Sequence, residues 1–334
     1  MINAAPAADA GWRRELASAI RNPAELARIL DLDPATLPGM RGADRAFRLL
    51  VPRGFAARMR RGDPGDPLLR QVLPVPEELA PQPAGHVTDP LSEAVATRAP
   101  GLLVKYRGRA LLVTSGACAV HCRYCFRRHF PYASQNPRRG RWDEAVSAIA
   151  ADAGLEEVIL SGGDPLMLGD DDLAALAERL ASIPHVRSLR IHTRLPIVLP
   201  ERVDETLLGW LKESRLPVTM VLHANHPNEL APDVADACRR LNTGVRFLLN
   251  QAVLLAGVND TVASLAGLSR GLFEAGVLPY YLHLPDAVAG TAHFHVDAPR
   301  GHQLIEALRG LLPGYLVPRL AREEPGAPGK RVLA

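Results

Sequence analysis

The sequence predicts an α/β fold, namely a partial (β/α)6 barrel of the TIM type preceded by an N-terminal helical extension. Two observations carry this prediction. From residue 109 onward, short apolar runs rich in β-branched residues alternate with amphipathic helical windows, and polar side chains follow the runs. The chain has 334 residues, 47% of them apolar, which is enough to bury one large core with a small appendage.

Residues 1–95 are predicted to form the helical extension. Its helical windows are short and separated by proline: GWRRELASAI, PAELARIL, ADRAFRLL and GFAARMRR. The stretch PVPEELAPQPAGHVTDP is rich in proline and indicates a connection. Residues 96–334 are predicted to form the barrel and a C-terminal segment.

Six strands are predicted in the barrel: ALLVTS, EVILSG, SLRIHT, PVTMVLH, VRFLLNQ and LPYYLHL. The helical windows between and after them are WDEAVSAIAADA, DDLAALAERLAS, DETLLGWLKES, APDVADACRRLN and TVASLAGLSRGLFEAG. Strands that are apolar along nearly their whole length fit a parallel sheet buried on both faces.

Polar groups follow the predicted strands. A cysteine-rich loop follows the first strand, and the later strands lead into Ser161-Gly162-Gly163-Asp164, His192 with Arg194, His223 with Asn225, Asn250 with Gln251, and His283 with Asp286. In a parallel βα barrel, the carboxyl ends of the strands gather on one face, and that face carries the active site. We therefore expect these groups to lie together.

Charge and composition narrow the class of protein. The net charge is +3, from 39 basic and 36 acidic residues that are interspersed, which favours neither nucleic-acid nor membrane partners. The start, MINAAPAADAGWRREL, lacks the apolar core of a signal peptide, and no stretch approaches the ~20 apolar residues of a spanning helix. We expect a cytoplasmic protein, where clustered cysteines are more often metal ligands or catalysts than disulfide partners.

Three of the four cysteines, Cys118, Cys122 and Cys125, stand at C-x3-C-x2-C spacing. A zinc site would need a fourth ligand, such as His121 or His129, and usually shows paired spacing. Three cysteines alone suit a [4Fe–4S] cluster with one iron left open. The fourth, Cys238, has helical spacing with Val234 and Leu241 and is predicted to pack in the core.

The cysteine loop after the first barrel strand resembles that of the radical S-adenosylmethionine (SAM) superfamily. The resemblance implies a [4Fe–4S] cluster held by Cys118, Cys122 and Cys125, with SAM chelating the open iron. LSGGDPL resembles the family's strand-two motif at the methionyl amino group, which implies that Ser161, Gly162, Gly163 and Asp164 bind SAM. The glycines would allow a close backbone approach there.

Residues 45–332 further resemble the lysine 2,3-aminomutase family, and most of all its short bacterial branch that serves β-lysylation of elongation factor P. The landmarks are VPRGFAARMRRGDPGDPLLRQVLP, PGLLVKYRGRALLV, CAVHCRYCFRRHFPY, LSGGDPLM, RIHTRLPIVLPERV, LLNQAVLL, PYYLHLPDAVAGTAHF and GYLVPRLARE. The resemblance implies conversion of L-α-lysine to (R)-β-lysine, an electron donor such as flavodoxin or ferredoxin, and a functional link to an elongation factor P ligase.

Pyridoxal 5'-phosphate is the third cofactor that the resemblance implies, held as a Schiff base by Lys330 in EEPGAPGKRVL. Only an amine can form this bond, and the chain has just three lysines. Further contacts with this cofactor are implied for Tyr106, Arg109, Asn250 and Gln251, with Lys105 at a basic position nearby.

The remaining implied roles concern the substrate. Arg127 would receive the carboxylate of lysine, whereas Asp286 and Glu323 would receive its ε-ammonium, with Glu324 adjacent to the latter. Arg128 would serve local structure. Three alternatives stay open on the sequence: a free-standing lysine 2,3-aminomutase for another pathway, a radical SAM enzyme without pyridoxal phosphate, and a structural metal module.

Overall fold

The computed structural model describes residues 11–36, 40–135 and 142–334. In these ranges one ten-stranded sheet has its strands in chain order. The strands are β1 (Thr97–Ala99), β2 (Leu102–Tyr106), β3 (Arg109–Ser115), β4 (Glu157–Gly162), β5 (Ser188–Thr193), β6 (Val218–Leu222), β7 (Phe247–Val253), β8 (Leu278–His283), β9 (Arg319–Arg322) and β10 (Arg331–Val332). The pairs from β3 to β9 are all parallel, as a partial βα barrel requires.

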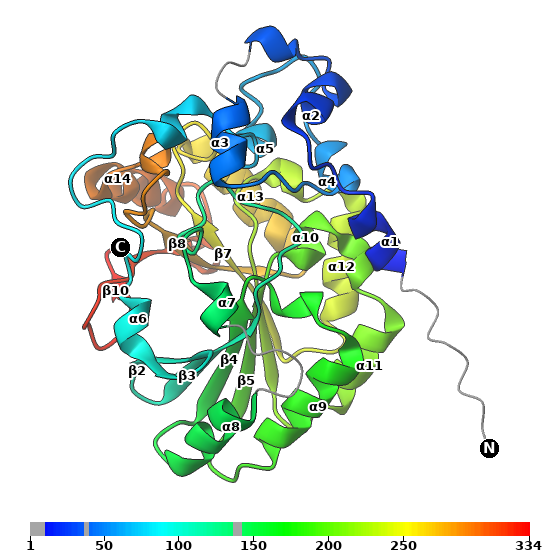
Figure 1. Ribbon diagram of the computed structural model, residues 1–334, viewed down its shortest axis with the longest axis vertical. Coiled ribbons are helices and arrows are strands. Elements are labelled where there is room, and N and C mark those ends of the chain that lie inside the picture. The colour runs from blue at the N-terminus through cyan, green and yellow to red at the C-terminus, as the bar shows by residue number, and fades with distance from the viewer. Residues whose placement is uncertain (1–10, 37–39, 136–141) are drawn as a thin grey trace.

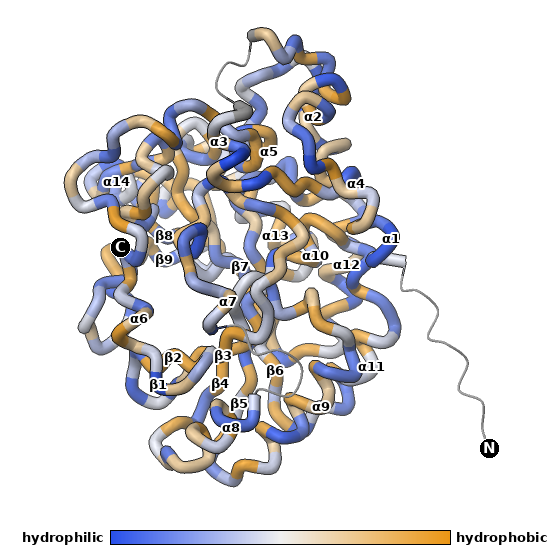
Figure 2. The backbone as a smooth tube through the Cα atoms, viewed as in Figure 1, coloured by the Kyte–Doolittle hydropathy of each residue, from blue (hydrophilic) through white to orange (hydrophobic). Residues whose placement is uncertain are grey.

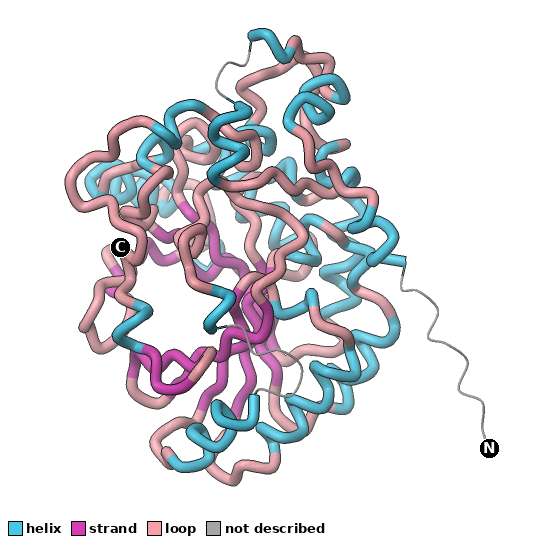
Figure 3. Tube along the Cα trace, in the orientation of Figure 1, coloured by secondary structure: helices cyan, strands magenta, loops and turns pink. Residues whose placement is uncertain are grey.

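The α-helices are α1 (Gly11–Ala17), α2 (Pro23–Ile29), α3 (Met40–Ala46), α4 (Arg53–Ala56), α5 (Pro67–Arg70), α6 (Glu93–Ala96), α7 (Tyr132–Gln135), α8 (Trp142–Ala151), α9 (Asp170–Ala181), α10 (Leu195–Val198), α11 (Glu205–Glu213), α12 (Pro232–Leu241), α13 (Val262–Glu274) and α14 (Ala298–Arg309). Figure 1 shows α9, α11 and α12 outside the strands, while α2 to α5 lie at one end of the molecule. Figure 3 shows the strands gathered inside this helical layer.

All six predicted barrel strands are confirmed, as β3 to β8. Their side chains explain why they form: β4 is buried from Val158 to Gly162, and β6 is buried except at Thr219. Figure 2 shows hydrophobic residues concentrated in β3 to β6. The predicted α/β partial barrel is therefore the observed fold.

The sheet extends beyond those six strands. β9 adds a seventh parallel member beside β8, and β10 pairs antiparallel with β9. At the other edge, β1 and β2 continue the sheet antiparallel to β3. The segment KYRGR, expected just before the first strand, is the turn of the β2–β3 hairpin, where Gly108 has a φ of +82°.

The N-terminal extension packs onto the barrel. Trp12, Leu26 and Phe55 belong to the same hydrophobic core as Leu166 and Ile197 of the barrel. The helix expected over GFAARMRR is shorter, because α4 ends at residue 56 and the carboxylate of Asp66 then accepts the backbone N–H groups of residues 60, 68 and 69. The boundary at residue 95 stays a prediction, since α6 spans it.

Within the described ranges, no helix has the length and apolar character needed to cross a membrane. The first ten residues, on which the expectation about a signal peptide depends, lie outside the described residues.

Candidate active site

The cysteine loop is fixed to the end of β4 by backbone contacts. The N–H of Gly163 donates to the carbonyl of Ser115 at 2.7 Å, and the N–H of Asp164 donates to that of Ala117 at 2.8 Å. A Cβ on Gly162 or Gly163 would lie 2.4 Å from a backbone oxygen of this loop, and Gly162 has a φ of +126°. The glycine pair therefore lets the end of β4 pack closely against the backbone of residues 115–117.

The three clustered cysteines are free and partly buried. Burial and the neighbouring thiols raise the pKa of Cys118, and the same two causes raise the pKa of Cys125 to about 12. These thiols therefore resist becoming three bare thiolates side by side, and bound cations would remove that penalty. This chemistry fits a metal cluster.

A single metal ion does not fit as well. Across residues 11–36, 40–135 and 142–334, no three His, Cys, Asp or Glu side chains converge where one ion would bind. A four-iron cluster makes a different demand, because each thiolate binds its own iron. Cys238 lies fully buried on α12, so its predicted place in the core is confirmed.

Cys122 also contacts a network of buried polar side chains. Nη1 of Arg194 donates to its sulfur at 2.7 Å, while Nη2 donates to Gln71 at 2.7 Å and to Glu229 at 3.0 Å. The hydroxyl of Tyr124, from the cysteine loop, accepts from Arg194 as well. This network holds the Cys122 sulfur in place through a guanidinium that is itself fixed by Gln71 and Glu229.

Asp164 joins β4 to β5 and is buried. Its carboxylate accepts from the hydroxyl of Thr193 at 2.7 Å and from backbone N–H groups of residues 166, 194 and 195. Burial outweighs these hydrogen bonds and raises its pKa to about 6. Ser161, by contrast, holds Arg127, which donates to its hydroxyl at 3.0 Å. The structure thus brings the glycine motif to the cysteine loop, while its role in binding SAM stays a prediction.

Arg127 is buried and fully engaged along one edge. Its Nε and Nη2 donate to both oxygens of Glu93 at 2.8 and 2.7 Å, and its Nη1 also donates to the carbonyl of Gly162 at 3.3 Å. The bidentate edge expected to meet a substrate carboxylate therefore holds Glu93 in this structure. Arg128 donates to Glu78 at 2.8 Å and to the carbonyl of Gly290 at 3.0 Å, which agrees with a structural role.

Lys330 lies inside the barrel rather than at a frayed terminus. Its Nζ is 3.2 Å from Nε2 of His283, 3.7 Å from an oxygen of Glu323, and 5.4 Å from the centre of the Tyr281 ring. Burial lowers its pKa, although the charges of Glu323 and Asp286 oppose that shift. A lowered pKa increases the fraction of neutral amine, which is the form that attacks an aldehyde.

Tyr106 and Arg109 lie beside Lys330 and have buried atoms without partners. The Arg109 Nε has no hydrogen-bond partner among the described residues. The Tyr106 hydroxyl makes no hydrogen bond of ordinary geometry there, but it lies beside the Glu323 carboxylate, and burial together with that contact raises the pKa of Tyr106. The Arg109 guanidinium lies over the Tyr106 ring at 4.9 Å, and a Cβ on Gly329 would be 3.7 Å from it. Donors left free beside a reactive amine fit an anionic aldehyde cofactor such as pyridoxal phosphate.

Asp286 and Glu323 lie near Lys330, as expected, but differ in charge state. Burial and the charge of Glu323 raise the pKa of Asp286 to about 7, although Lys330 opposes the shift. The pKa of Glu323 is lowered, because the charges of Lys330 and Lys105 overcome its burial. Glu324, in contrast, is engaged by Arg322 and Arg331.

Three histidines at strand ends, His192, His223 and His283, are neutral near pH 7. Burial is the main cause that lowers the pKa of each, and it lowers that of His223 to about 3. His283 can accept from the Lys330 amine, and His223 bonds the Tyr124 hydroxyl at 2.9 Å. The positive charges near these strand ends therefore come from lysines and arginines, and not from these three histidines.

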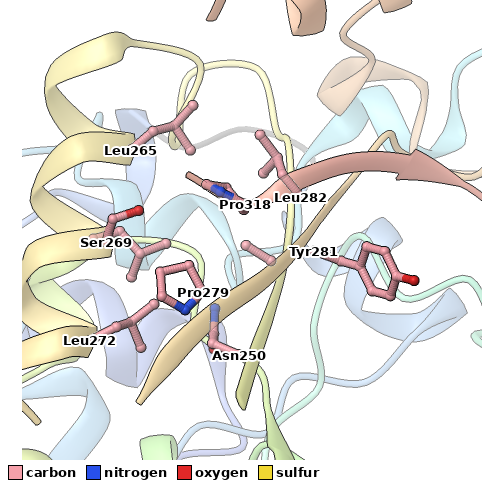
Figure 4. Close-up of a pocket in the computed structure, with 10 residues that line it drawn as sticks. Asn250, Leu265, Ser269, Leu272, Pro279, Tyr281, Leu282 and Pro318 are labelled. Carbon is pink, nitrogen blue, oxygen red and sulfur yellow. The ribbon is translucent and has the colours of Figure 1, made fainter. Parts of the chain in front are cut away.

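Asn250 does not join the polar residues around Lys330. Its side-chain amide bonds the backbone N–H and C=O of Ala224 at 2.8 and 3.0 Å. Figure 4 shows Asn250 at a small cavity between the sheet and α13, while Tyr281 extends away from that cavity. Gln251 is half-buried on the same strand. Cofactor contacts by these two residues stay predictions.

The N-terminal extension supplies three buried side chains that the sequence analysis did not single out: Gln71, Glu78 and Glu93. They bond Arg194, Arg123 and Arg127, respectively. Glu78 lies in the proline-rich connection, and Glu93 opens a helix of only four residues. The one sequence feature that could have pointed to these residues is the arginine-rich run after Cys122, because buried arginines require acidic partners.

Comparison with known families first defines the class. The family model described as the radical SAM superfamily matches residues 112–260, from β3 to the start of the α13 region. The crystal structure of a radical SAM methyltransferase from Sphaerobacter thermophilus covers 66% of this chain and 68% of its own, with a TM-score of 0.46 and 19% identity. Residues 112–260 therefore carry a radical SAM domain, and this family implies a [4Fe–4S] cluster and SAM.

Relatives define the particular family. The L-lysine 2,3-aminomutase of Escherichia coli (strain K12) is 48% identical over 96% of this chain and 94% of the relative. The protein of the same name from Haemophilus influenzae is 46% identical over 97% and 95%, and that of Clostridium subterminale is 35% identical over 96% and 76%. The chain belongs to the lysine 2,3-aminomutase family, whose members are isomerases of the aminomutase type.

Proposed function

We propose that the protein is a pyridoxal-phosphate-dependent lysine 2,3-aminomutase that converts L-α-lysine to (R)-β-lysine. The observation that carries this proposal is Lys330, a half-buried amine between His283 and Glu323 with the Arg109 donor beside it. A radical SAM enzyme without pyridoxal phosphate would give no role to this arrangement. The family's name for its relatives points to the same substrate.

Each cofactor has a proposed set of holding residues. Cys118, Cys122 and Cys125 would bind the cluster, the Ser161–Asp164 motif would bind SAM, and Lys330 would bind pyridoxal phosphate with Tyr106 and Arg109 at its phosphate and ring. When bound, the cluster and SAM supply a radical that abstracts hydrogen, and pyridoxal phosphate supplies a conjugated ring that delocalises an unpaired electron.

The protein's own residues bind and orient the substrate. Arg127 keeps one Nη2 hydrogen beyond its bonds to Glu93, Ser161 and Gly162, and this donor would meet the substrate carboxylate. Asp286 and Glu323 would receive the ε-ammonium, since a buried charge needs a partner. Neutral His283 can accept a hydrogen bond from the Lys330 Nζ, which orients that amine.

Borohydride reduction of the protein reconstituted with pyridoxal phosphate, followed by peptide mapping, tests the proposal. The adduct is expected on Lys330 and lost in Lys330→Ala, while Lys212→Ala, at an exposed position on α11, keeps it. An adduct on Lys105 or Lys212 would contradict the proposal. Anaerobic turnover of lysine with SAM and dithionite, with chiral analysis of the product, tests the reaction and its stereochemistry.

The product's destination is the second part of the proposal: modification of elongation factor P in the cytoplasm, with reduction by a flavodoxin or ferredoxin. It rests on the resemblance to the short bacterial branch and on the match over 94% of the length of the Escherichia coli relative. The expected result is that a gene deletion leaves elongation factor P without β-lysine and that added (R)-β-lysine restores it. Normal modification in the deletion strain would favour a free-standing aminomutase for another pathway.

A further inference from the structure

Five charged side chains from four segments form one continuous chain of alternating charge. Arg127 contacts Glu93 at 2.7 Å, Glu93 contacts Lys105 at 3.0 Å, and Lys105 contacts Glu323 at 3.0 Å. Glu323 then lies 3.7 Å from Lys330. The chain crosses the cysteine loop, α6, β2 and the segment between β9 and β10. It therefore connects the part of the site around Cys118, Cys122 and Cys125 (the cysteine half) with the part around Lys330 (the lysine half).

The middle of this chain is held away from solvent. The Glu93 side chain is 3% exposed and that of Lys105 is 15% exposed. Burial alone would raise the pKa of Glu93, but the charges of Arg127 and Lys105 bring it down to about 2. A buried ion that loses a partner is costly, and the single ammonium of Lys105 is the partner that Glu93, also held by Arg127, shares with Glu323.

Two members of the chain, Arg127 at one end and Glu323 beside Lys330 at the other, are groups that the proposed function assigns to lysine. A carboxylate at Arg127 and an ammonium at Glu323 would each extend the alternation by one charge. Lysine has these two charges at opposite ends of one molecule, whereas ornithine, one methylene shorter, brings them closer together. A rigid chain between the two subsites would therefore fix the distance between them and favour substrates whose two charges are separated by that distance.

We propose that Lys105 is a positioning residue that, with Glu93, fixes the separation between the carboxylate and ammonium subsites and so selects lysine over ornithine. The inference rests on the proposed function, because it uses Arg127 and Glu323 as substrate partners. Lys105 touches neither end of the substrate itself. It acts through Glu93 on one side and through Glu323 on the other.

The test compares Lys105→Met, Lys105→Arg and Glu93→Gln, with Lys212→Met as a matched control on the exposed face of α11. Lys105→Met is expected to raise KM for lysine about 10- to 100-fold while kcat changes less than about threefold, as for a loss of ground-state positioning. Its preference for lysine over ornithine should fall by about tenfold, and Lys105→Arg, which keeps the cation, should recover most of both.

Two readouts do not depend on turnover. Calorimetric titration of lysine into the reconstituted protein should show the same loss of affinity in Lys105→Met. The pH at which the pyridoxal imine band forms should move upward, because Lys330 loses a neighbouring cation. Iron and pyridoxal phosphate per chain should equal those of the unmodified protein.

The Lys105→Met/Glu93→Gln double variant gives the sharpest outcome. Both changes break the same chain, so their effects on lysine affinity should be clearly less than additive. Additive effects, unchanged lysine affinity in Lys105→Met, or loss of pyridoxal phosphate from that variant would each overturn the inference, the last by making Lys105 a cofactor ligand. Failure of the proposed function would instead show in the unmodified protein, as lysine that is neither bound nor converted.

Discussion

The cysteine half and the lysine half of the site differ in how deeply their charged side chains are buried. Around the cysteines, Arg123, Arg127 and Arg194 are buried, and each donates several hydrogen bonds to acceptors of the protein itself. Around Lys330, the side chains of Tyr106, Arg109 and Glu323 are half-buried. Donors without a partner among the described residues occur in both halves, at the Arg194 Nε in the first and at the Tyr106 hydroxyl and Arg109 Nε in the second, so the difference is chiefly one of burial.

This difference indicates what each half is prepared to bind. The cysteine half presents its thiols among buried arginines that each donate several hydrogen bonds to protein acceptors, which is a rigid mount for a cofactor. The lysine half has donors whose burial is compensated only when an acceptor arrives, and such groups mark ligand contacts. Occupancy should therefore change the stability of the lysine half more than that of the cysteine half.

Removing a thiol gives the largest expected effect on this comparison. Cys118→Ala, Cys122→Ala and Cys125→Ala should each abolish iron binding and turnover, because no neighbouring group can replace an iron ligand. Cys238→Ala, a core position, should keep about one four-iron cluster per chain, the amount expected of the unmodified protein. Iron and sulfide analysis of anaerobically purified protein measures this. A bleached Cys238→Ala beside an intact Cys122→Ala would refute the ligand assignment.

Asp286→Asn should have the next largest effect, confined to the lysine half. Loss of one partner of a buried ammonium is expected to weaken lysine binding by about 2–5 kcal/mol, while iron and pyridoxal content stay unchanged. Asp233→Asn, at an exposed position, is the control. Initial rates with lysine and with glutamate test the assignment, and unmodified enzyme that turned over glutamate faster than lysine would contradict it.

The fold was predictable because its signal is local. In apolar runs such as EVILSG and amphipathic windows such as DDLAALAERLAS, the residue pattern itself indicates which side chains become buried, and both segments formed as predicted. β9 was not predicted, because it is four residues long with charged residues at both ends. Its place depends on pairing with β8, which no local pattern records.

The site was predictable where a residue's chemistry is rare and not where its role depends on a partner. Three spaced cysteines drew attention by residue type and spacing, and the scarcity of lysine supported Lys330, which the resemblance to the aminomutase family implied. Glu93 did not, because an acidic residue after a proline-rich connection is common at surfaces. Only the fold brings it to Arg127, 34 positions away in sequence. Asn250 shows the converse, since its amide groups bind the backbone.

The pH dependence should separate substrate binding from stability within the lysine half. Asp286 must be ionised to receive an ammonium, so with a pKa of about 7 the kcat/KM for lysine should fall as pH decreases below 7, by at most about tenfold per pH unit. The stability effect has the opposite sign. A carboxyl whose pKa is raised by folding contributes stability that is present below its ordinary pKa and lost as pH rises through about 7.

The pH dependence of kcat/KM and that of stability can both be measured on the unmodified protein and on Asp286→Asn. Rate profiles and urea midpoints between pH 5.5 and 8 should both flatten at this transition in Asp286→Asn, because asparagine does not titrate there. Profiles that remain unchanged in this variant would assign the transition to another group and would remove Asp286 from the ammonium subsite.

Tyr106→Phe should give the smallest effect and is the most direct test of the difference between the two halves. Removing a buried hydroxyl without a partner should stabilise the cofactor-free protein by about 1 kcal/mol, whereas loss of a donor to the bound cofactor should weaken pyridoxal phosphate binding about three- to tenfold. Burial and the charge of Glu323 raise the pKa of Tyr106, so the hydroxyl stays protonated and can only gain by donating. Tyr315→Phe, at a position 59% exposed, should change neither quantity.

Thermal unfolding of the cofactor-free protein and titration with pyridoxal phosphate measure these two effects of Tyr106→Phe. Opposite signs in the two assays would show that the lysine half gains its missing hydrogen bonds from a ligand, and equal affinity for pyridoxal phosphate in Tyr106→Phe would show that the hydroxyl is unpaired for another reason.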